Sequence, residues 1–320
     1  MLKIFKKNAF WYLALIAVIY LMGWGLKITA ERMDYTWHWN RVPHYFLFTG
    51  LVDHYSSDEG VAHVDKIDDQ KSKVTLEYKN GKKDVFTILS KTLLVKDGSP
   101  VTEVDKIGSE KVVSQGILVT GLITTLEISM YSAVLGMLIG ILAGMGRIST
   151  NPLFKGLSTI YVEIIRGTPL LVQIFIFYFF FGTILELTRF TAGMLALAFF
   201  TGAYVAEIIR AGIQSIDPGQ MEAARSLGMN YVQSMIHIIM PQALKRTLPP
   251  MAGQFISLIK DSSLVSVIAI TDLTKAGREI ITTSFYVFEI WTVVALMYLV
   301  LTFSLSMVVR YIERRFSVSD

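Results

Sequence analysis

The sequence predicts an all-α polytopic membrane protein with about six transmembrane helices and a small extracytoplasmic β-rich insert. Three observations predict this fold class. Of the 320 residues, 52% are hydrophobic and 18% charged, and the mean hydropathy is +0.50, more apolar than ordinary soluble domains. Apolar runs recur, each near or above the ~20 residues that a helix needs to cross ~30 Å of hydrocarbon. A polar, strand-prone stretch separates the first run from the others.

Residues 1–29 are predicted to form an N-terminal transmembrane anchor. A basic front precedes an apolar run from about Ala9 to Leu26. A cleaved signal peptide is the alternative, but the run is long enough to span a bilayer and no small-x-small cleavage site follows before Glu31. We therefore expect a retained anchor.

Residues 30–112 are expected to form a small β domain outside the membrane. The stretch KVTLEYKNGKKDVFTI places Asn80-Gly81 between two strand-prone runs, a strong hairpin signal, and KTLLVKDGSPVTEV repeats the pattern with a Gly-Ser-Pro turn. The aromatic opening YTWHWNRVPHY favours a belt at the membrane interface over a ligand-binding face.

Residues 113–320 carry the remaining apolar runs. They predict five membrane spans, near residues 117–146, 169–187, 190–213, 249–270 and 287–310.

Basic residues in the short loops predict the orientation of these spans. If the N-terminus lies inside, thirteen basic residues fall on the inner side and only three on the outer side, so both termini and the loop 214–248 are expected in the cytoplasm. The inner set is Lys3, Lys6, Lys7, Arg147, Lys155, Arg166, Arg210, Arg225, Lys245, Arg246, Arg310, Arg314 and Arg315, and the outer set is Arg189, Lys275 and Arg278.

The loop 214–248 contains a short polar helix with a signal at each end. In DPGQMEAARSLG, Asp217 is placed as N-cap, Pro218 as first helical residue, Gln220 at the capping-box position and Gly228 as the stop. Its body is too small and polar to be held in a core, whereas its small residues would let another protein approach closely and Leu227 could act as an apolar knob.

A second helix, NYVQSMIHIIM, follows directly. Asn230 is its predicted cap, Gln233 occupies the capping-box position and Pro241 is expected to end it. Two capped helices in one loop favour a docking surface, and the alternative is a helical hairpin that lies passively on the lipid headgroups.

These helices resemble the EAA signature of the transmembrane subunits of ABC importers. The matching residues are Glu222-Ala223-Ala224, Gly228, Ile238 and Pro241, with Met240 where the signature favours Leu. The flanking stretches VEIIRGTPLLVQ, TGAYVAEIIRAGIQSI, GQMEAARSLGMN and SLIKDSSLVSVIAI look like the polar amino-acid permeases of that group. The resemblance covers about residues 114–316.

The resemblance implies a type I importer permease for polar amino acids in a bacterial inner membrane. The implied partners are a cytoplasmic ABC ATPase dimer, a second identical or paralogous permease, an extracytoplasmic substrate-binding protein and membrane lipid. The chain has no GxxxxGK[ST] motif, so ATP and Mg²⁺ are expected on the partner ATPase, with no cofactor or catalytic residue on this chain. The implied coupling residues are Asp217, Gly219, Gln220, Glu222, Ala223, Ala224, Leu227, Gly228 and Pro241.

Composition excludes several other chemistries. The chain has no cysteine, which rules out disulfides and thiolate catalysis, and its five histidines are scattered singly, so no metal site is signalled. The net charge of +4 does not indicate nucleic-acid binding, because the basic residues lie mostly beside apolar runs.

Polar residues predicted inside the membrane are candidates for a substrate pathway. Glu127 and Lys260 both fall near mid-depth of their spans, where charge is costly. One hypothesis is that Glu127 meets the ammonium and Lys260 the carboxylate of an amino acid; the alternative is that they pair with each other or with Asp261 and serve packing. Asp261 and Ser262 also predict a helix irregularity that would suit a pathway.

Other residues are predicted to have structural or gating roles. Gly136, Gly140 and Gly144 form a small-xxx-small pattern that lets two spans approach closely. Residues 271–285 predict an amphipathic segment at the outer surface. The gating and structural candidates, for which an ion pair or a helix start is the simpler role, are Glu163, Arg166, Thr168, Pro169, Glu207 and Arg210.

Two other functions predict different sequence features. A membrane-anchored sensor or interaction protein working through its outer β domain would need neither mid-depth charges nor capped inner helices, and a secondary transporter would show repeated halves. The sequence has both mid-depth charges and capped helices in the inner loop, and it has no convincing internal repeat. These features favour the permease.

Overall fold

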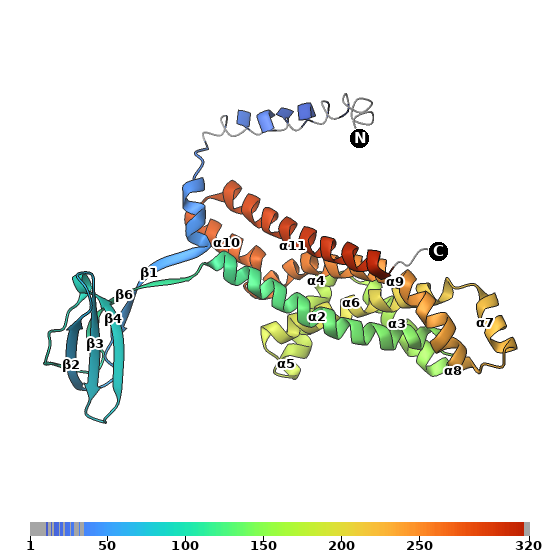
Figure 1. Ribbon diagram of the computed structural model, residues 1–320, viewed down its shortest axis with the longest axis horizontal. Helices are drawn as coiled ribbons and strands as arrows, with labels where there is room; N and C mark the ends of the chain where they lie inside the picture. Colours follow the sequence, from blue (N-terminus) through green and yellow to red (C-terminus); the bar gives the residue numbers. More distant parts are fainter. Residues whose placement is uncertain are drawn as a thin grey trace. The chain divides into compact units, whose positions relative to one another are not determined.

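The computed structural model describes residues 35–316 and, before them, residues 11, 14, 16–18, 20, 21, 23–25, 27, 28 and 32 (Figure 1). Contacts divide the chain into two compact units, Met1–Val42 and Pro43–Asp320. A short 3-10 helix, η1 (Trp39–Tyr45), spans the division. The predicted anchor over residues 1–29 lies largely outside the described residues.

The β-rich region contains two antiparallel sheets. A two-stranded ribbon pairs β1 (Leu47–Tyr55) with β6 (Lys106–Gln115), and a four-stranded sheet has the order β4-β3-β2-β5. The strands of that sheet are β2 (Gly60–Lys66), β3 (Lys71–Tyr78), β4 (Lys83–Leu89) and β5 (Ser99–Val101), and a short 3-10 helix, η2 (Ser90–Thr92), follows β4. Alternate residues of β3, among them Val74 and Leu76, are fully buried with Ile88, so one face of the sheet forms a core.

The hairpin predicted at Asn80-Gly81 is confirmed. Gly81 adopts φ +82° and its N–H donates to the Tyr78 carbonyl at 2.9 Å, which turns β3 into β4. The second strand-prone stretch forms only the short β5, because the segment before it is a loop whose Leu94 N–H donates to the Ile107 carbonyl at 2.9 Å. The predicted boundary at residue 112 falls inside β6.

Helices make up most of the described chain after β6. They are α2 (Ile117–Ile148), α3 (Pro152–Gly167), α4 (Leu170–Phe175), the π-helix η3 (Ile176–Phe181), α5 (Gly182–Ile184), α6 (Arg189–Gln214), α7 (Pro218–Ser226), α8 (Tyr231–Ser234), the π-helix η4 (Met235–Ile239), α9 (Met240–Asp261), the 3-10 helix η5 (Ser262–Ile268), α10 (Leu273–Ser284) and α11 (Val287–Phe316).

Three of the described helices, α2, α6 and α11, are long and apolar enough to cross a membrane. A fourth span is present if α3 and the segment Leu170–Ile184, which meet at 108°, count as one. Of the five spans predicted in this part of the chain, three correspond to α2, α6 and α11. The span predicted at 169–187 falls on the second arm of the bent pair, and the one predicted at 249–270 falls on α9 and η5, which are not among these candidate spans.

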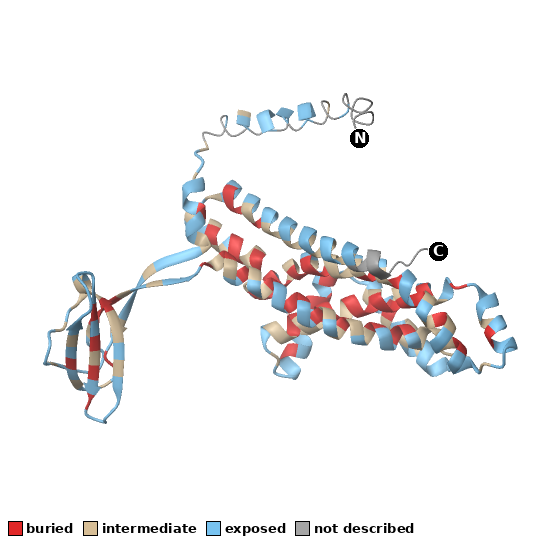
Figure 2. Cartoon of the chain, viewed as in Figure 1, coloured by how far each residue is buried: buried red, intermediate tan, exposed pale blue. Residues whose placement is uncertain are grey.

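The three glycines of α2 lie against α6, as the small-xxx-small pattern predicts. A methyl group added at Gly136 or Gly144 would lie 3.0 Å from a backbone carbonyl oxygen of α6, and one at Gly140 would lie 2.4 Å from Val205 Cγ1. Buried residues therefore concentrate where α2 and α6 face each other (Figure 2). The absence of side chains at these positions lets the two backbones approach.

The helix irregularity predicted at Asp261-Ser262 is confirmed, since α9 gives way there to η5. Ser262 is fully buried and its Oγ donates to the Ile259 carbonyl at 2.8 Å. The predicted amphipathic segment is α10, which buries one face against α2 and α11.

The prediction that Pro241 ends the second loop helix is wrong. The chain continues from α8 through η4 into α9, and Pro241 lies in the first turn of α9. The reason is the wider π-helical turn before it, in which the Met240 N–H donates to the Met235 carbonyl. A first-turn position tolerates proline, and a π-helical turn lets the helix pass it without a break.

Candidate functional site

The predicted ends of α7 are confirmed. Asp217 Oδ1 accepts from the Gly219 N–H at 2.7 Å, and Pro218 is the first helical residue. At the other end, Gly228 adopts φ +85° and the Met229 N–H donates to the Ala224 carbonyl at 3.2 Å. This is a Schellman ending, which closes the helix with a left-handed residue. Local sequence therefore fixes both the start and the stop of α7.

The capping box is confirmed in only one of the two helices. Asn230 Oδ1 accepts from the Gln233 N–H at 2.9 Å and Gln233 Oε1 accepts from the Asn230 N–H at 3.0 Å, so the box forms in α8. Gln220 in α7 does not complete one: its Oε1 accepts from Gln242 Nε2 at 3.2 Å. Gln220 thereby ties α7 to α9 instead of capping its own helix.

One face of α7 is seated and the other is free in this chain. Ala224 is 4% exposed, and Met221 packs on a cluster that includes Ile216 and Ile239. The opposite face is exposed, and Leu227 at its end is 84% exposed. We call this opposite face the coupling face, after the role that the sequence predicts for it; its residues are Gly219, Glu222, Ala223 and Leu227.

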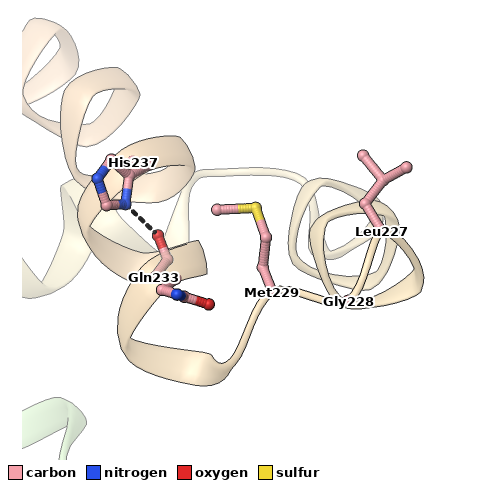
Figure 3. A pocket seen from close by; sticks show the side chains of 5 residues that line it. All are labelled: Leu227, Gly228, Met229, Gln233 and His237. Atoms are coloured by element: carbon pink, nitrogen blue, oxygen red, sulfur yellow. Dashed lines mark hydrogen bonds between the residues drawn. The ribbon is translucent and has the colours of Figure 1, made fainter.

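A hollow of about 300 Å³ lies beside the end of α7. Figure 3 shows its lining, with Leu227 on one side and Gln233 and His237 on the other, and His237 Nδ1 lies 3.0 Å from the Gln233 carbonyl. Met229 and His237 escaped sequence reasoning. The spacing of His237 four residues after the capping-box Gln233 is the signal that could have placed it on this face.

Four of the gating candidates and one further arginine meet at the ends of α2, α3 and α6. Glu207 is the hub: its carboxylate lies 2.6 Å from Arg147 Nη1, 3.0 Å from Arg210 Nε and 3.9 Å from Arg166 Nη1. Glu163 lies 3.5 Å from Arg147 Nη2. The expected Glu207–Arg210 pair is therefore part of a cluster that joins three helices, with three guanidinium groups and two carboxylates. Thr168 and Pro169, the other two candidates, stand at the bend between α3 and α4, where Pro169 starts α4 as predicted.

The pathway candidates Glu127 and Lys260 are not brought together. No ion pair joins their side chains in the described part of the chain, and both are exposed. Lys260 lines a pocket of about 280 Å³, and Asp261 is intermediate in exposure. The other lining residues are Ser263, Thr274, Trp291, Val294, Ala295 and Tyr298.

A buried polar group adjoins that pocket. Asp272 is fully buried as the N-cap of α10 and accepts from the Lys275 N–H at 3.0 Å. Tyr298 Oη lies 3.0 Å from Thr274 Oγ1 and 3.3 Å from Asp272 Oδ2. Sequence reasoning missed this network, because Asp272 and Tyr298 stand 26 residues apart.

Long apolar helices, joined by a loop that carries two capped helices, are the features of a membrane-embedded protein. The chain belongs to the family of binding-protein-dependent transport system inner membrane components, whose pattern matches residues 136–318. It is therefore a membrane transport subunit.

Its relatives include amino-acid ABC permeases. It is 44% identical over 200 residues to a probable glutamine ABC transporter permease protein of Bacillus subtilis (strain 168), which covers 62% of this chain and 93% of that protein. It is 38% identical over 205 residues to a glutamine transport system permease protein of Escherichia coli (strain K12), which covers 63% of this chain and 94% of that protein.

Solved structures agree with the fold. An amino acid ABC transporter solved with histidines matches at 41% identity with a TM-score of 0.59, covering 62% of this chain and 94% of that one. An inward-facing methionine ABC transporter matches at 21% identity and a TM-score of 0.56, covering 63% and 96%, which supports the fold alone. These proteins are matched over almost their whole length, so about a third of this chain has no counterpart in them.

Proposed function

We propose that the chain is the permease subunit of an ATP-driven importer for polar amino acids, coupled to its ATPases through α7. The observation that carries the proposal is the coupling face, a rigidly capped helix with small residues and an exposed Leu227. A short element fixed at both ends can transmit displacement without bending. The chain belongs to a family of binding-protein-dependent transport components, and two of its relatives are named as glutamine permeases. Both findings support an amino-acid permease.

In this proposal a cytoplasmic ABC ATPase dimer binds ATP and Mg²⁺ and moves the α7 helices of two permease subunits, identical or paralogous. A substrate-binding protein outside the cell delivers the amino acid. The membrane is the bacterial inner membrane, with both termini and the loop 214–248 in the cytoplasm. The excess of basic residues in the loops on that side supports the orientation.

The deciding experiment reconstitutes the chain into proteoliposomes with its ATPase and binding protein and follows uptake of labelled polar amino acids. Uptake should need ATP and both partners, and glutamine should be among the transported substrates. Uptake that proceeds without ATPase would contradict the proposal. Single cysteines are diagnostic of orientation because the chain has none of its own: a membrane-impermeant reagent should label Lys79→Cys from outside and Arg225→Cys only from inside.

We propose that Lys260 lines the substrate pathway and binds the carboxylate of the transported amino acid. Lys260 lines the 280 Å³ pocket together with the hydroxyl-bearing residues Ser263, Thr274 and Tyr298. Asp261 and Ser262, at the break between α9 and η5, lie between Lys260 and Ser263 in the chain. The Lys260 ammonium and these hydroxyl groups can donate hydrogen bonds to the carboxylate and the side-chain amide oxygen of a polar amino acid.

Replacing Glu127 tests the predicted contact between its carboxylate and the ammonium group of the substrate. Glu127→Gln keeps the shape of the side chain and removes its charge, so uptake should fall by about tenfold, the size of a lost ~1.4 kcal/mol interaction, while assembly with the ATPase stays intact. Initial uptake rates against substrate concentration check this. Glu103→Gln, an exposed carboxylate in the β-rich region, is the matched control. Unchanged transport by the Glu127 variant would exclude the substrate role.

We further propose that residues 30–112 form an extracytoplasmic domain distinct from the anchor 1–29 and the permease domain 113–320. The ribbon returns the chain to its starting point: Leu47 pairs with Gln115, and the Gly116 N–H donates to the Phe46 carbonyl at 2.8 Å. The insert is therefore a single excursion between two adjacent points of the chain. It could dock the binding protein, shield the outer gate or brace the permease dimer.

Trimming the insert separates these roles. Joining Phe48 to Ser114, which face each other across the ribbon, through an Asn-Gly turn should leave a folded permease that retains its ATPase. If the insert docks the binding protein, uptake driven by that protein should be lost while ATPase retention persists; if it braces the dimer, dimers should also fall apart. Co-purification, dimer content and uptake are measured on the same preparations. Loss of the ATPase on trimming would contradict the proposed division into domains.

A further inference from the structure

The bend between α3 and α4 is held by one side chain. Gln173 Nε2 donates to the Ile165 carbonyl at 2.7 Å, to Thr168 Oγ1 at 2.9 Å and to the Thr168 carbonyl at 3.1 Å. The last carbonyls of a helix have no partner within it, and Pro169 has no N–H to offer them. Gln173 reaches back from α4 and satisfies them, so the 108° bend and these bonds form together.

The same bend carries Arg166 to the charge cluster. Arg166 Nη1 lies 3.9 Å from Glu207 Oε2, and its guanidinium carbon lies 5.3 Å from the centre of the Tyr204 ring. Of the three arginines on Glu207 it has the longest contact and the most exposed side chain, 39% against 14% for Arg147 and 28% for Arg210. Glu207 would keep two partners if Arg166 left, so Arg166 is the contact most easily released.

Gln173 also has an unsatisfied atom. Its side chain is 4% exposed, and its Oε1 has no hydrogen-bond partner in the part of the chain that the structure describes. A buried acceptor without a partner is unfavourable, which offsets part of what the three donated bonds contribute. The bend is thus held by specific bonds that leave one buried acceptor unpaired.

We propose that the turn at residues 165–169 is a releasable joint, held bent by Gln173 and kept against α6 by Arg166, whose angle changes when the ATPases bind ATP. Gln173 acts as a positioning residue, since it works through the placement of Arg166. The role in the ATP cycle rests on the proposed function. The Gln173 hydrogen bonds and the Arg166–Glu207 contact, which we call the clasp, do not rest on it, because they are contacts within this chain.

Distance measurements between spin labels test the joint. Leu157→Cys on α3 and Thr183→Cys on α5 are both exposed and lie on opposite sides of the bend, and the chain has no other cysteine to react. The full chain in lipid nanodiscs should give one dominant distance. In complex with its ATPase, trapping with ATP should shift that distance.

Two variants test the clasp without any ATPase. Gln173→Met keeps the length of the side chain and removes its donors, and Arg166→Gln removes the ion contact; each should broaden the distance distribution toward the ATP-trapped distance. Arg189→Gln, at the opposite end of α6, is the matched control and should leave the distribution unchanged.

The outcomes are separable. Unchanged distributions in both clasp variants would overturn the joint, as would an unchanged distance on ATP trapping. Should Gln173→Met fail to fold, Arg166→Gln carries the same test, because its side chain is more than one third exposed. Failure of the chain to bind any ATPase would count against the proposed function and not against the clasp.

Discussion

A proline at position 228 is expected to abolish ATP-driven uptake. Gly228 adopts φ +85°, whereas proline is held near −65°, and its N–H donates to the Arg225 carbonyl at 3.0 Å, a bond that proline cannot make. The Schellman ending of α7 would be lost, and with it the direction in which Leu227 points. Because Leu227 ends the coupling face, the ATPase should no longer be retained, and uptake should fall by at least about tenfold.

Graded substitutions make this result specific to the backbone. Gly228→Ala should have an intermediate effect, since an L-residue in this left-handed conformation costs roughly 1–2 kcal/mol. Gly253→Ala, in α9, is the control, because a methyl group there meets open space. Co-purified ATPase and uptake rate are measured together. Full ATPase retention by Gly228→Pro would mean that α7 is not the coupling element.

The second large effect is expected at Gly140 in α2. A methyl group there would lie 2.4 Å from Val205 Cγ1 and 2.9 Å from the Gly202 carbonyl oxygen, so Gly140→Leu must push α2 away from α6. Overpacking typically costs about 1–3 kcal/mol, and here the neighbours include backbone that cannot yield. The purified subunit should unfold at a clearly lower temperature in detergent, or fail to accumulate.

Gly156→Leu in α3 provides the comparison, since its added side chain starts from a position with no atom within 4 Å. Thermal unfolding of both variants, followed by fluorescence-detected size-exclusion chromatography after heating, gives the result. Equal midpoints for the two variants would show that the α2–α6 contact contributes little to stability.

Local signals were the most predictable from the sequence. The caps of α7 at Asp217 and Gly228, the hairpin at Asn80-Gly81 and the break at Asp261-Ser262 each depend on a few consecutive residues whose backbone preferences agree with the fold. The close approach at the α2 glycines was equally predictable, because their spacing on one helix face can be recognised without knowing which helix packs there.

Features that join distant segments were not predictable. Arg147 and Glu207 are 60 residues apart, and only folding shows that they share a cluster with Arg166. Gln173 reads as an ordinary polar residue until the bend brings Thr168 within reach. Pro241 misled for a related reason: its usual meaning as a helix end was overridden by the π-helical turn before it.

The bare end of α7 has a consequence for a subunit made without its partner. Leu227 is followed on α8 and η4 by Tyr231, Val232 and Ile236, which are all exposed, so a copy made alone presents several apolar side chains in this loop. Contiguous exposed apolar surfaces mark interaction sites or promote aggregation. If the proposed ATPase covers this loop, copies made in excess of the ATPase are therefore expected to aggregate.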